Sequence, residues 1–309
     1  MKRRSFIKKA SVSALMLGTI SNNLFAGTKE QFTKLTILHT NDLHSRILPF
    51  PKGSRYEGLG GAAKRAQLIK EIRAKEKNVL LFDSGDIFQG TPFFNQFGGE
   101  LELKLMSEMA YDASTLGNHD FDAGLEGFEK QLHLANFPFL NVNYSFDDTI
   151  LNGKIEKYKV FEKEGLKIGV FGLGIELNGL VPEKLYKGVL YEDPVIKANE
   201  TAFFLKNKLK CDYVVCLSHL GLKYNSEKIS DVKLAKNSQN IDLILGGHTH
   251  SFLDEPMKVN NLDNAVVAIN QVGWAGILLG RLEIYFEKNL KKNRKKQAPV
   301  IFSKKTIVK

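Results

Sequence analysis

The residues with the clearest chemical potential lie in one short segment, 117–122. Asn118 offers a neutral amide oxygen to a metal ion, and His119 beside it could act as a general acid. Asp122 could hydrogen-bond the other ring nitrogen of His119 and so fix its tautomer. An apolar run at 113–116 precedes them, so these side chains would stand where a strand ends and a loop opens. A plain strand-end turn explains the same residue types equally well.

Four further motifs occupy the same kind of position, each just after an apolar run. Their polar side chains belong to Asp42 and His44, Asp86, His219, and His248 and His250. In extended backbone the i, i+2 spacing within two of these motifs would aim both side chains the same way. Five of the seven histidines of the chain fall in such loops. We expect the other two, His39 and His133, to be ordinary core or surface residues.

The donor types indicate the kind of metal site. With His119 set aside, the motifs supply four imidazoles, two carboxylates and one amide, without a thiolate. This set is typical of hydrolytic sites for Zn, Mn or Fe, and it exceeds the needs of one ion. The pattern therefore favours two divalent metal ions bridged by a carboxylate. Cys211 and Cys216 would point to opposite faces of one strand, which excludes a disulfide and leaves them as core residues.

The rest of the chain alternates apolar runs with amphipathic segments, which favours an α/β protein with a mixed sheet. We expect helices at 62–75, 101–109, 124–135, 196–208 and 231–237. We expect strands at 35–38, 79–82, 113–116, 137–142, 158–161, 167–171, 213–217, 241–245, 266–269 and 277–286, the last two antiparallel. The sequence contains no internal repeat and no linker rich in Pro, Gly or Ser.

The formal net charge of +10 belongs to the two ends of the chain. Residues 1–9 carry five basic residues and residues 291–309 carry eight, without an acidic residue in either segment, which leaves −3 for residues 10–290. A mildly acidic body argues against a nucleic-acid-binding groove. We expect residues 291–309 to form a basic tail, solvated rather than bound to an anionic surface.

Residues 1–27 have the organisation of an export signal. Arg3 and Arg4 precede an apolar run of 11 residues at 10–20, too few for the roughly 20 that span a membrane. The paired arginines followed by Ser-Phe-Ile-Lys resemble a twin-arginine signal, which implies export of a folded protein to a periplasmic or extracellular location. A basic cytosolic N-terminus is the alternative. The sequence thus predicts a signal at 1–27, one domain at 28–290, a tail at 291–309 and no stable membrane span.

Taken in order, the motifs resemble the signature of calcineurin-like metallophosphoesterases. Within that family the chain is most similar to the catalytic domain of bacterial periplasmic 5′-nucleotidases and UDP-sugar hydrolases, over residues 35–287. The resemblance lies in Thr40-Asn41-Asp42-Leu43-His44, Gly85-Asp86 with Gln89-Gly90-Thr91-Pro92, Gly117-Asn118-His119-Asp120, Ser218-His219-Leu220-Gly221 and Gly246-Gly247-His248-Thr249-His250. It implies a metallophosphoesterase catalytic domain at 28–290, folded as a four-layer αββα sandwich with two mixed β-sheets.

The resemblance also implies a role for each motif residue. One metal ion would be held by Asp42, His44, Asp86 and His250, and the second by Asp86, Asn118, His219 and His248, with Asp86 as the bridge. His119 with Asp122 matches the catalytic dyad of the family. The implied reaction is hydrolysis of phosphate esters of nucleotides by attack of a metal-bridging hydroxide, with His119 protonating the leaving oxygen.

The chain departs from the two-domain nucleotidases at its end. Those proteins continue into a C-terminal domain that binds the substrate, and this sequence stops where that domain would begin, so a separate chain could supply it. Trp274, with Phe93 and Phe94, could stack on a base, although we favour core packing for them. Two other functions compete: a thiosulfohydrolase of the sulfur-oxidation type, and a non-catalytic subunit that binds a partner. The complete ligand set counts against the second.

Overall fold

A computed structural model describes residues 32–287 and 300–308. Its strands are β1 (Phe32–Thr40), β2 (Val79–Asp83), β3 (Ala113–Ser114), β4 (Tyr144–Ser145), β5 (Tyr158–Lys163), β6 (Leu166–Leu173), β7 (Leu190–Tyr191), β8 (Tyr213–Ser218), β9 (Leu243–Gly246), β10 (Met257–Asn260), β11 (Val266–Asn270), β12 (Leu278–Glu287) and β13 (Val300–Ile307). Its helices are α2 (Ala62–Lys75), α3 (Pro92–Phe97), α4 (Glu100–Glu108), α5 (Gly124–Leu132), α6 (Pro194–Phe203) and α7 (Asp231–Lys236), with short helical turns at His119–Phe121, Glu183–Leu185 and Phe204–Lys208. The predicted export signal at 1–27 lies outside the described residues.

The chain divides into two compact units, one of which holds the helices and the site. The larger unit comprises residues 35–283 and 302–309. The smaller comprises 1–34 and 284–301, and its described residues belong to the ends of β1, β12 and β13. Within the smaller unit the Lys34 ammonium lies 6.0 Å from the centroid of the Tyr285 ring.

Two sheets dominate the topology, in the strand orders β13-β12-β1-β2-β3 and β10-β11-β9-β8-β6-β5. In the first sheet β1, β2 and β3 run parallel. In the second, β6, β8, β9 and β11 run parallel and the edge strands β5 and β10 are antiparallel to their neighbours. The predicted α/β class with mixed sheets is confirmed.

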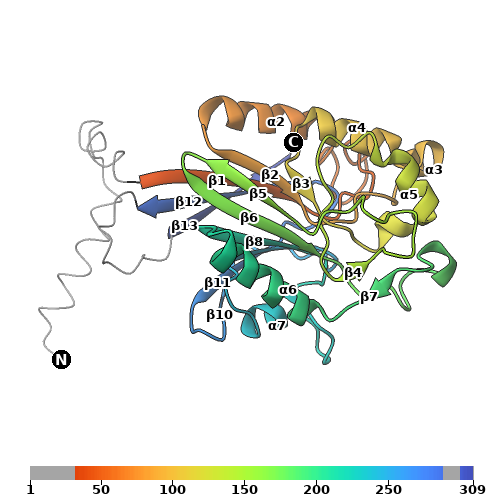
Figure 1. Ribbon diagram of the computed structural model, residues 1–309. Helices are drawn as coiled ribbons and strands as arrows, with labels where there is room; N and C mark the ends of the chain where they lie inside the picture. Colours follow the sequence, from red (N-terminus) through yellow and green to blue (C-terminus); the bar gives the residue numbers. More distant parts are fainter. Residues whose placement is uncertain (1–31, 288–299, 309) are drawn as a thin grey trace, which may run out of the picture. The chain divides into compact units, whose positions relative to one another are not determined.

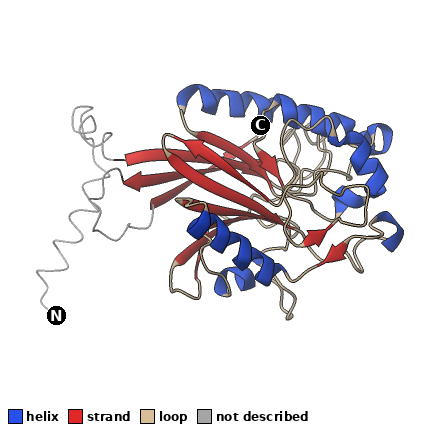
Figure 2. Ribbon diagram, in the orientation of Figure 1, coloured by secondary structure: helices blue, strands red, loops and turns tan. Residues whose placement is uncertain are grey.

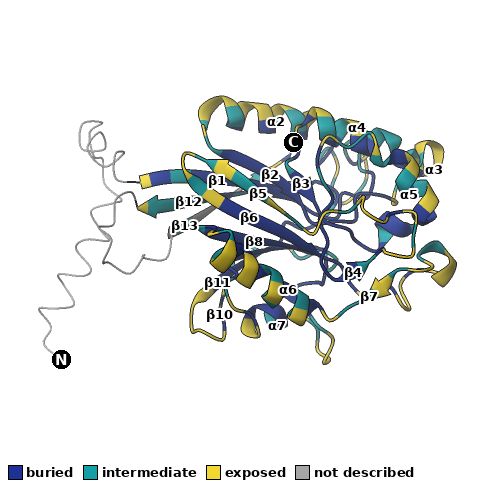
Figure 3. Ribbon diagram, in the orientation of Figure 1, coloured by how far each residue is buried: buried dark blue, intermediate teal, exposed yellow. Residues whose placement is uncertain are grey.

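The sheets of the larger unit lie face to face, with helices on their outer sides (Figures 1 and 2). Phe82 of β2 contacts Phe161 of β5 across the sheets, with ring centroids 5.8 Å apart. Asn270 of β11 donates a hydrogen bond of 2.8 Å to Nε2 of His39 on β1. His39 is therefore a buried core residue, as expected. Burial is concentrated in the strands, and the outer faces of the helices are exposed (Figure 3).

Local sequence explains where the helices of the second layer begin. The Asp193 carboxylate accepts hydrogen bonds from the backbone of Val195 and Ile196 at 2.8 and 3.0 Å, and Pro194 takes the first position of α6. Ser230 caps α7 by accepting from the backbone of Lys233 at 3.3 Å. α6 contacts β6, and α7 contacts β9, whose end carries candidate ligands.

Three predicted segments differ in the structure. Residues 137–142 form only isolated bridges, because Asn141 turns the chain by accepting hydrogen bonds from the backbone of Asn143 and Tyr144. Their apolar side chains are nevertheless buried, so the apolar run correctly indicated burial but not a strand. β11 runs parallel to β9 and antiparallel only to β10, whereas we expected antiparallel pairing. Within the predicted tail, residues 291–299 are not described, but residues 300–307 form β13.

Gly172 marks a close approach between β6 and the segment at 140–142. Val142 donates a backbone hydrogen bond to the Gly172 carbonyl at 3.0 Å, and a Cβ atom at position 172 would overlap the carbonyl oxygen of Leu140. Gly169, on the same strand, is a matched comparison. A Cβ atom there would lie 3.1 Å from the side chains of Leu205 and Cys211, which can move.

We expect Gly172→Ala to lower the free energy of unfolding by roughly 1–3 kcal/mol more than Gly169→Ala, because rigid backbone cannot yield as side chains do. Urea denaturation of the two variants measures this difference. Equal unfolding midpoints would mean that the segment at 140–142 moves away from β6 without cost.

Candidate metal centre

The seven candidate ligands follow the carboxyl ends of five strands. Asp42 follows β1, Asp86 follows β2, Asn118 follows β3, His219 follows β8, and His248 and His250 follow β9; His44 lies two residues beyond Asp42. β1, β2 and β3 run parallel in the first sheet, and β8 and β9 run parallel in the second. The carboxyl ends of each group therefore lie at one edge of its sheet. The structure brings all seven side chains to this edge.

Asp42, His44 and His250 form one cluster with converging donor atoms. His250 Nε2 lies 3.1 Å from Asp42 Oδ1 and 3.1 Å from His44 Nε2. His44 Nε2 lies 3.9 Å from Asp42 Oδ1. One carboxylate and two imidazoles thus face a common point, with Asp42 and His44 buried and His250 partly exposed.

Asp86, His219 and His248 form a second cluster, and Asn118 adjoins it. His219 Nε2 lies 3.0 Å from Asp86 Oδ2. His248 Nδ1 lies 2.9 Å from Asn118 Oδ1, so the amide oxygen that the sequence singles out faces the same point. Asp86 and His219 are both buried.

The two clusters are neighbours, and buried carboxylates lie between them. His44 of the first cluster lies 3.9 Å from Asp86 Oδ2 of the second. His219 of the second lies 4.0 Å from Asp42 Oδ1 of the first. Asp86 is therefore near imidazoles of both clusters, the position that a bridging ligand requires.

Burial and charge at this edge fit a cationic occupant. Burial alone would raise the pKa of Asp86, but the surrounding imidazoles, His219 first, hold it well below its usual range. Burial alone would lower the pKa of His219, but Asp86 and Asp42 raise it to about 10. The buried Nε2 of His219 makes no well-directed hydrogen bond. Oxygen and imidazole nitrogen donors arranged in this way suit borderline divalent metal ions.

The backbone of the ligand loops is left-handed where the sequence pattern presumed extended chain. Positive φ angles of 47–69° occur at Asp42, His44, Asp86, His248 and His250. The predicted common direction of His248 and His250 is wrong, since they join different clusters. Asp42 and His44 do converge, but through a turn. Strained backbone of this kind persists only where surrounding contacts impose it, and it is concentrated at functional sites.

Asn41 and Asp120 support the ligands, and sequence reasoning gave neither a role. Asn41 accepts a hydrogen bond from the Val272 backbone at 3.0 Å and donates to the Gly273 carbonyl at 2.6 Å and to Asp42 Oδ2 at 2.5 Å. Asp120 accepts from the backbone N–H groups of residues 86, 87, 88 and 117 at 2.8–3.3 Å. The position of Asn41 between β1 and Asp42 was the available signal.

His119 and Asp122 pair beside the clusters. The His119 Nδ1 and Asp122 Oδ2 atoms are 2.8 Å apart, and this hydrogen bond is the main cause that raises the pKa of His119. The His119 backbone donates to Asp86 Oδ1 at 2.8 Å. Its ring centroid lies 5.3 Å from that of His44. The ring is half-buried, so its far nitrogen can meet a substrate while Asp122 holds the near one.

The structure also shows where the other residues that the sequence singled out lie. Trp274 is partly buried and packs against the core cluster of Phe50, Ala275 and Ile277. It also stacks on His250, with ring centroids 5.4 Å apart and an interplanar angle of 3°. Phe94 packs in the core against Phe88. Cys211 and Cys216 are buried free thiols. No helix among the described residues is both long and apolar enough to cross a membrane.

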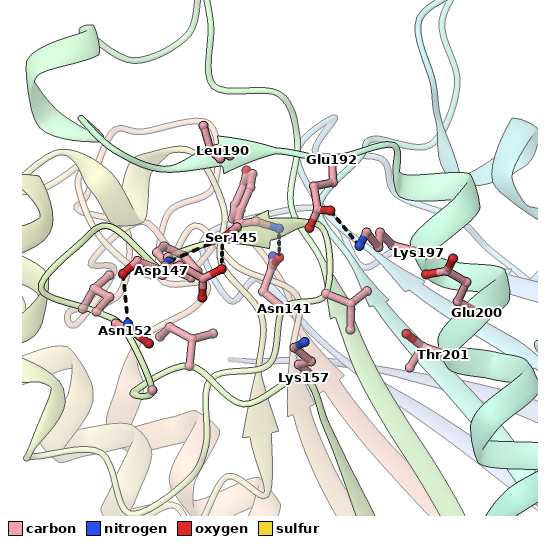
Figure 4. Close-up of a pocket in the computed structure, with 16 residues that line it drawn as sticks. Asn141, Ser145, Asp147, Asn152, Lys157, Leu190, Glu192, Lys197, Glu200 and Thr201 are labelled. Carbon is pink, nitrogen blue, oxygen red and sulfur yellow. Dashed lines mark hydrogen bonds and ion pairs between the residues drawn. The ribbon is translucent and has the colours of Figure 1, made fainter.

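A cavity of about 640 Å³ lies apart from the candidate ligands (Figure 4). Its walls come from the segment at 141–157, from Leu190 and Glu192, and from α6, and they include none of the seven ligands. Lys197 pairs with Glu192 at 2.6 Å, and Ser145 donates to Asp147 at 2.9 Å. Several polar groups of the walls thus bind one another, whereas the two donor clusters found among the described residues lie at the strand ends.

Comparison with known proteins agrees with this geometry. A family model described as calcineurin-like phosphoesterase matches residues 35–252. The snake venom 5′-nucleotidase of Crotalus adamanteus is 32% identical over 296 residues, which cover 88% of this chain and 48% of that protein. The chain spans about half the length of the curated relatives it matches.

Solved structures give the same picture for the fold. The 5′-nucleotidase precursor of Thermus thermophilus superposes with a TM-score of 0.78 at 29% identity, covering 89% of this chain and 54% of that one. The sulfate thiohydrolase SoxB of Thermus thermophilus superposes with a TM-score of 0.71 at 19% identity, covering 89% and 56%. At that identity the second likeness concerns the fold alone.

Proposed function

This chain belongs to the calcineurin-like phosphoesterase family, and from that premise we propose that it is a metal-dependent hydrolase of phosphate esters, with nucleotides as substrates. The observation that carries the proposal is the pair of adjoining clusters with buried Asp86 between them. The 5′-nucleotidase names of its relatives support the substrate class.

We assign each metal ion four ligands. Asp42, His44, Asp86 and His250 would hold one, and Asp86, Asn118, His219 and His248 would hold the other. Two divalent ions, Mn, Zn or Fe, would supply Lewis-acid activation of water and would neutralise phosphate oxygens. The contribution of the chain is to fix their positions through backbone that Asn41 and Asp120 clamp.

His119 acts as the general acid. Its Nδ1 atom is bound to Asp122, so the proton that it transfers is carried on Nε2. It gives this proton to the ester oxygen as the bond between phosphorus and oxygen breaks. Asp122 keeps the ring oriented and favours the protonated form before transfer.

Phosphate esters are favoured over the two competing functions. The likeness to the sulfate thiohydrolase rests on fold, whereas two 5′-nucleotidase relatives are 32% and 34% identical to this chain over the aligned residues. A purely binding subunit would have no use for the His119–Asp122 pair or for a complete ligand set. A separate chain that supplies a substrate-binding domain stays a prediction, which the comparisons do not support.

Export belongs to the same proposal. A twin-arginine-type signal at 1–27, a catalytic domain at 28–290 and a basic tail at 291–309 would send a folded, metal-loaded enzyme to a periplasmic or extracellular location. We expect the processed wild-type protein to be detected outside the cytoplasm. The variant in which Arg3 and Arg4 are both changed to Lys should stay inside the cytoplasm.

Removal of metal should abolish turnover reversibly. We expect the full chain, supplied with Mn, Zn or Fe, to hydrolyse AMP, UDP-glucose or p-nitrophenyl phosphate. A chelator should reduce the rate to background, and the same metal should restore it, because the ligand side chains cannot activate water by themselves. Phosphate release measures the rates. Turnover that persists in the chelated, metal-free protein contradicts the proposal.

A further inference from the structure

His250 differs from His44 and His219 in how its ring is held. His44 Nδ1 lies 3.3 Å from the Phe88 carbonyl oxygen, and His219 Nδ1 lies 2.6 Å from the Ser84 carbonyl oxygen. Such hydrogen bonds fix the orientation and the tautomer of a metal-binding imidazole. Among the described residues none pairs with Nδ1 of His250, whose side chain is 39% exposed. This ligand therefore lacks the usual support.

Trp274 provides support of another kind. Its ring lies parallel to the His250 ring within 3°, with centroids 5.4 Å apart, which is the geometry of offset stacking. In this position Nε2 of His250 points to Asp42 Oδ1 at 3.1 Å. The stacked indole limits rotation of the imidazole out of the plane in which its nitrogen faces the cluster.

The indole is itself held from several sides. The rings of Phe50 and Tyr56 meet it edge-on, with centroids at 5.7 and 6.3 Å and interplanar angles of 73° and 78°. Its segment is tied to both ligand loops, because Ala275 N donates to the Asp42 carbonyl at 2.7 Å and Gly273 N donates to the Ser251 carbonyl at 2.9 Å. Trp274 is thus a fixed platform.

We propose that Trp274 is a positioning residue for His250, and through it for the divalent metal ion at the cluster of Asp42, His44 and His250. The inference rests on the proposed metal centre but not on the identity of the ester. Without the platform, metal binding must first order the imidazole, so affinity falls at this cluster. The cluster of Asp86, His219 and His248 has no ring contact with Trp274 and keeps its affinity.

The first test measures Co²⁺ binding to the full chain by visible absorption in competition with a chelator. We expect Trp274→Leu to lower the affinity for one of the two ions by about 10–100-fold, the range typical when a hydrogen-bonding partner of a metal ligand is lost. The affinity for the other ion should be unchanged. Trp274→Phe, which keeps an aromatic face, should restore most of that affinity. Tyr56→Leu removes one of the rings that hold the indole without touching His250, so it should weaken binding of the same ion by less than Trp274→Leu does.

The second test needs no change at position 274, so it stands even if Trp274→Leu does not fold. Trp274 is the one tryptophan of the sequence, and its fluorescence therefore reports on this contact. Paramagnetic Co²⁺ bound by His250 should quench the emission in step with the filling of one site. In His250→Ala the quenching should weaken and lose that correspondence.

The outcomes separate the possibilities. Equal weakening of both ions in Trp274→Leu, or weakening no greater than in Tyr56→Leu, overturns the positioning role while leaving the metal centre intact. Fluorescence that ignores Co²⁺ in a wild-type chain that binds two ions also overturns it. A wild-type chain that binds no ion at all overturns the proposed function as well.

Discussion

Asp86→Ala should reduce kcat for AMP by at least about 10³-fold and lower the metal content of the chain from two ions to one or none. The reason is the position of this carboxylate: it lies 3.0 Å from His219 of one cluster and 3.9 Å from His44 of the other. Its loss removes a donor from both, and several kcal/mol of transition-state stabilisation go with the ions. Metal analysis after dialysis, together with steady-state kinetics, measures both effects.

A matched control and a comparison sharpen this prediction. Asp147→Ala removes a carboxylate from the wall of the separate cavity and should leave rate and metal content unchanged. Asp42→Ala should cost the ion of its own cluster first, and the double variant with Asp86→Ala should be little worse than Asp86→Ala alone, since the ligands act as a unit. An Asp86→Ala protein that keeps two ions and wild-type turnover would refute the assignment of Asp86 as the shared ligand.

His119→Gln should lower kcat for AMP by roughly 10²–10⁴-fold while both metal ions stay bound. The ribose oxygen leaves poorly unless it receives a proton, and His119 is placed by Asp122 to give one. The loss should be much smaller with p-nitrophenyl phosphate, whose leaving group departs without protonation. Rates for the two substrates, with metal content determined in parallel, test this expectation.

Two further variants separate proton transfer from other roles. Asp122→Asn removes the charged partner of His119 and should give a smaller loss with the same dependence on leaving group. His133→Gln changes an exposed histidine whose ring pairs with the Lys130 carbonyl and should have no effect. Equal losses on both substrates in His119→Gln would mean that the imidazole stabilises the phosphate or the ions, and does not supply the proton.

The sequence predicted the positions of the candidate ligands more accurately than their orientations. Alternation of apolar runs and polar motifs placed Asp86 and His219 at strand ends, because a buried strand must stop before charged groups can meet solvent or metal. It could not orient His248 and His250, since the i, i+2 argument presumes extended backbone and their φ angles are 69° and 50°. Only contacts from distant segments impose such angles, and the local sequence does not record them.

The same limit explains the errors in the fold and the missed residues. Residues 137–142 have the composition of a strand, and their burial is real, but the side chain of Asn141 bonds the backbone that a ladder would have used. The lysines around residues 300–307 suggested a solvated end, whereas this segment forms a strand because it pairs with the edge of β12. Asn41 acts on Val272 and Gly273, partners that no window around residue 41 contains.

The long-range hydrogen bonds of Asn41 bear on when the candidate metal centre can form during synthesis. Its side chain forms hydrogen bonds with Val272 and Gly273, which follow it by 231 and 232 positions in the sequence. The same side chain also bonds the carboxylate of Asp42. During synthesis the backbone of the loop that carries Asp42 can bond Gly85 and Asp86 early, but the Asn41 side chain lacks its partner at residue 273 until that residue has been made. Contacts of such high sequence separation form late and slowly. Because the proposed ligands run from Asp42 to His250, the complete set of donors exists only after most of the chain has been made, and we expect metal loading to follow that point.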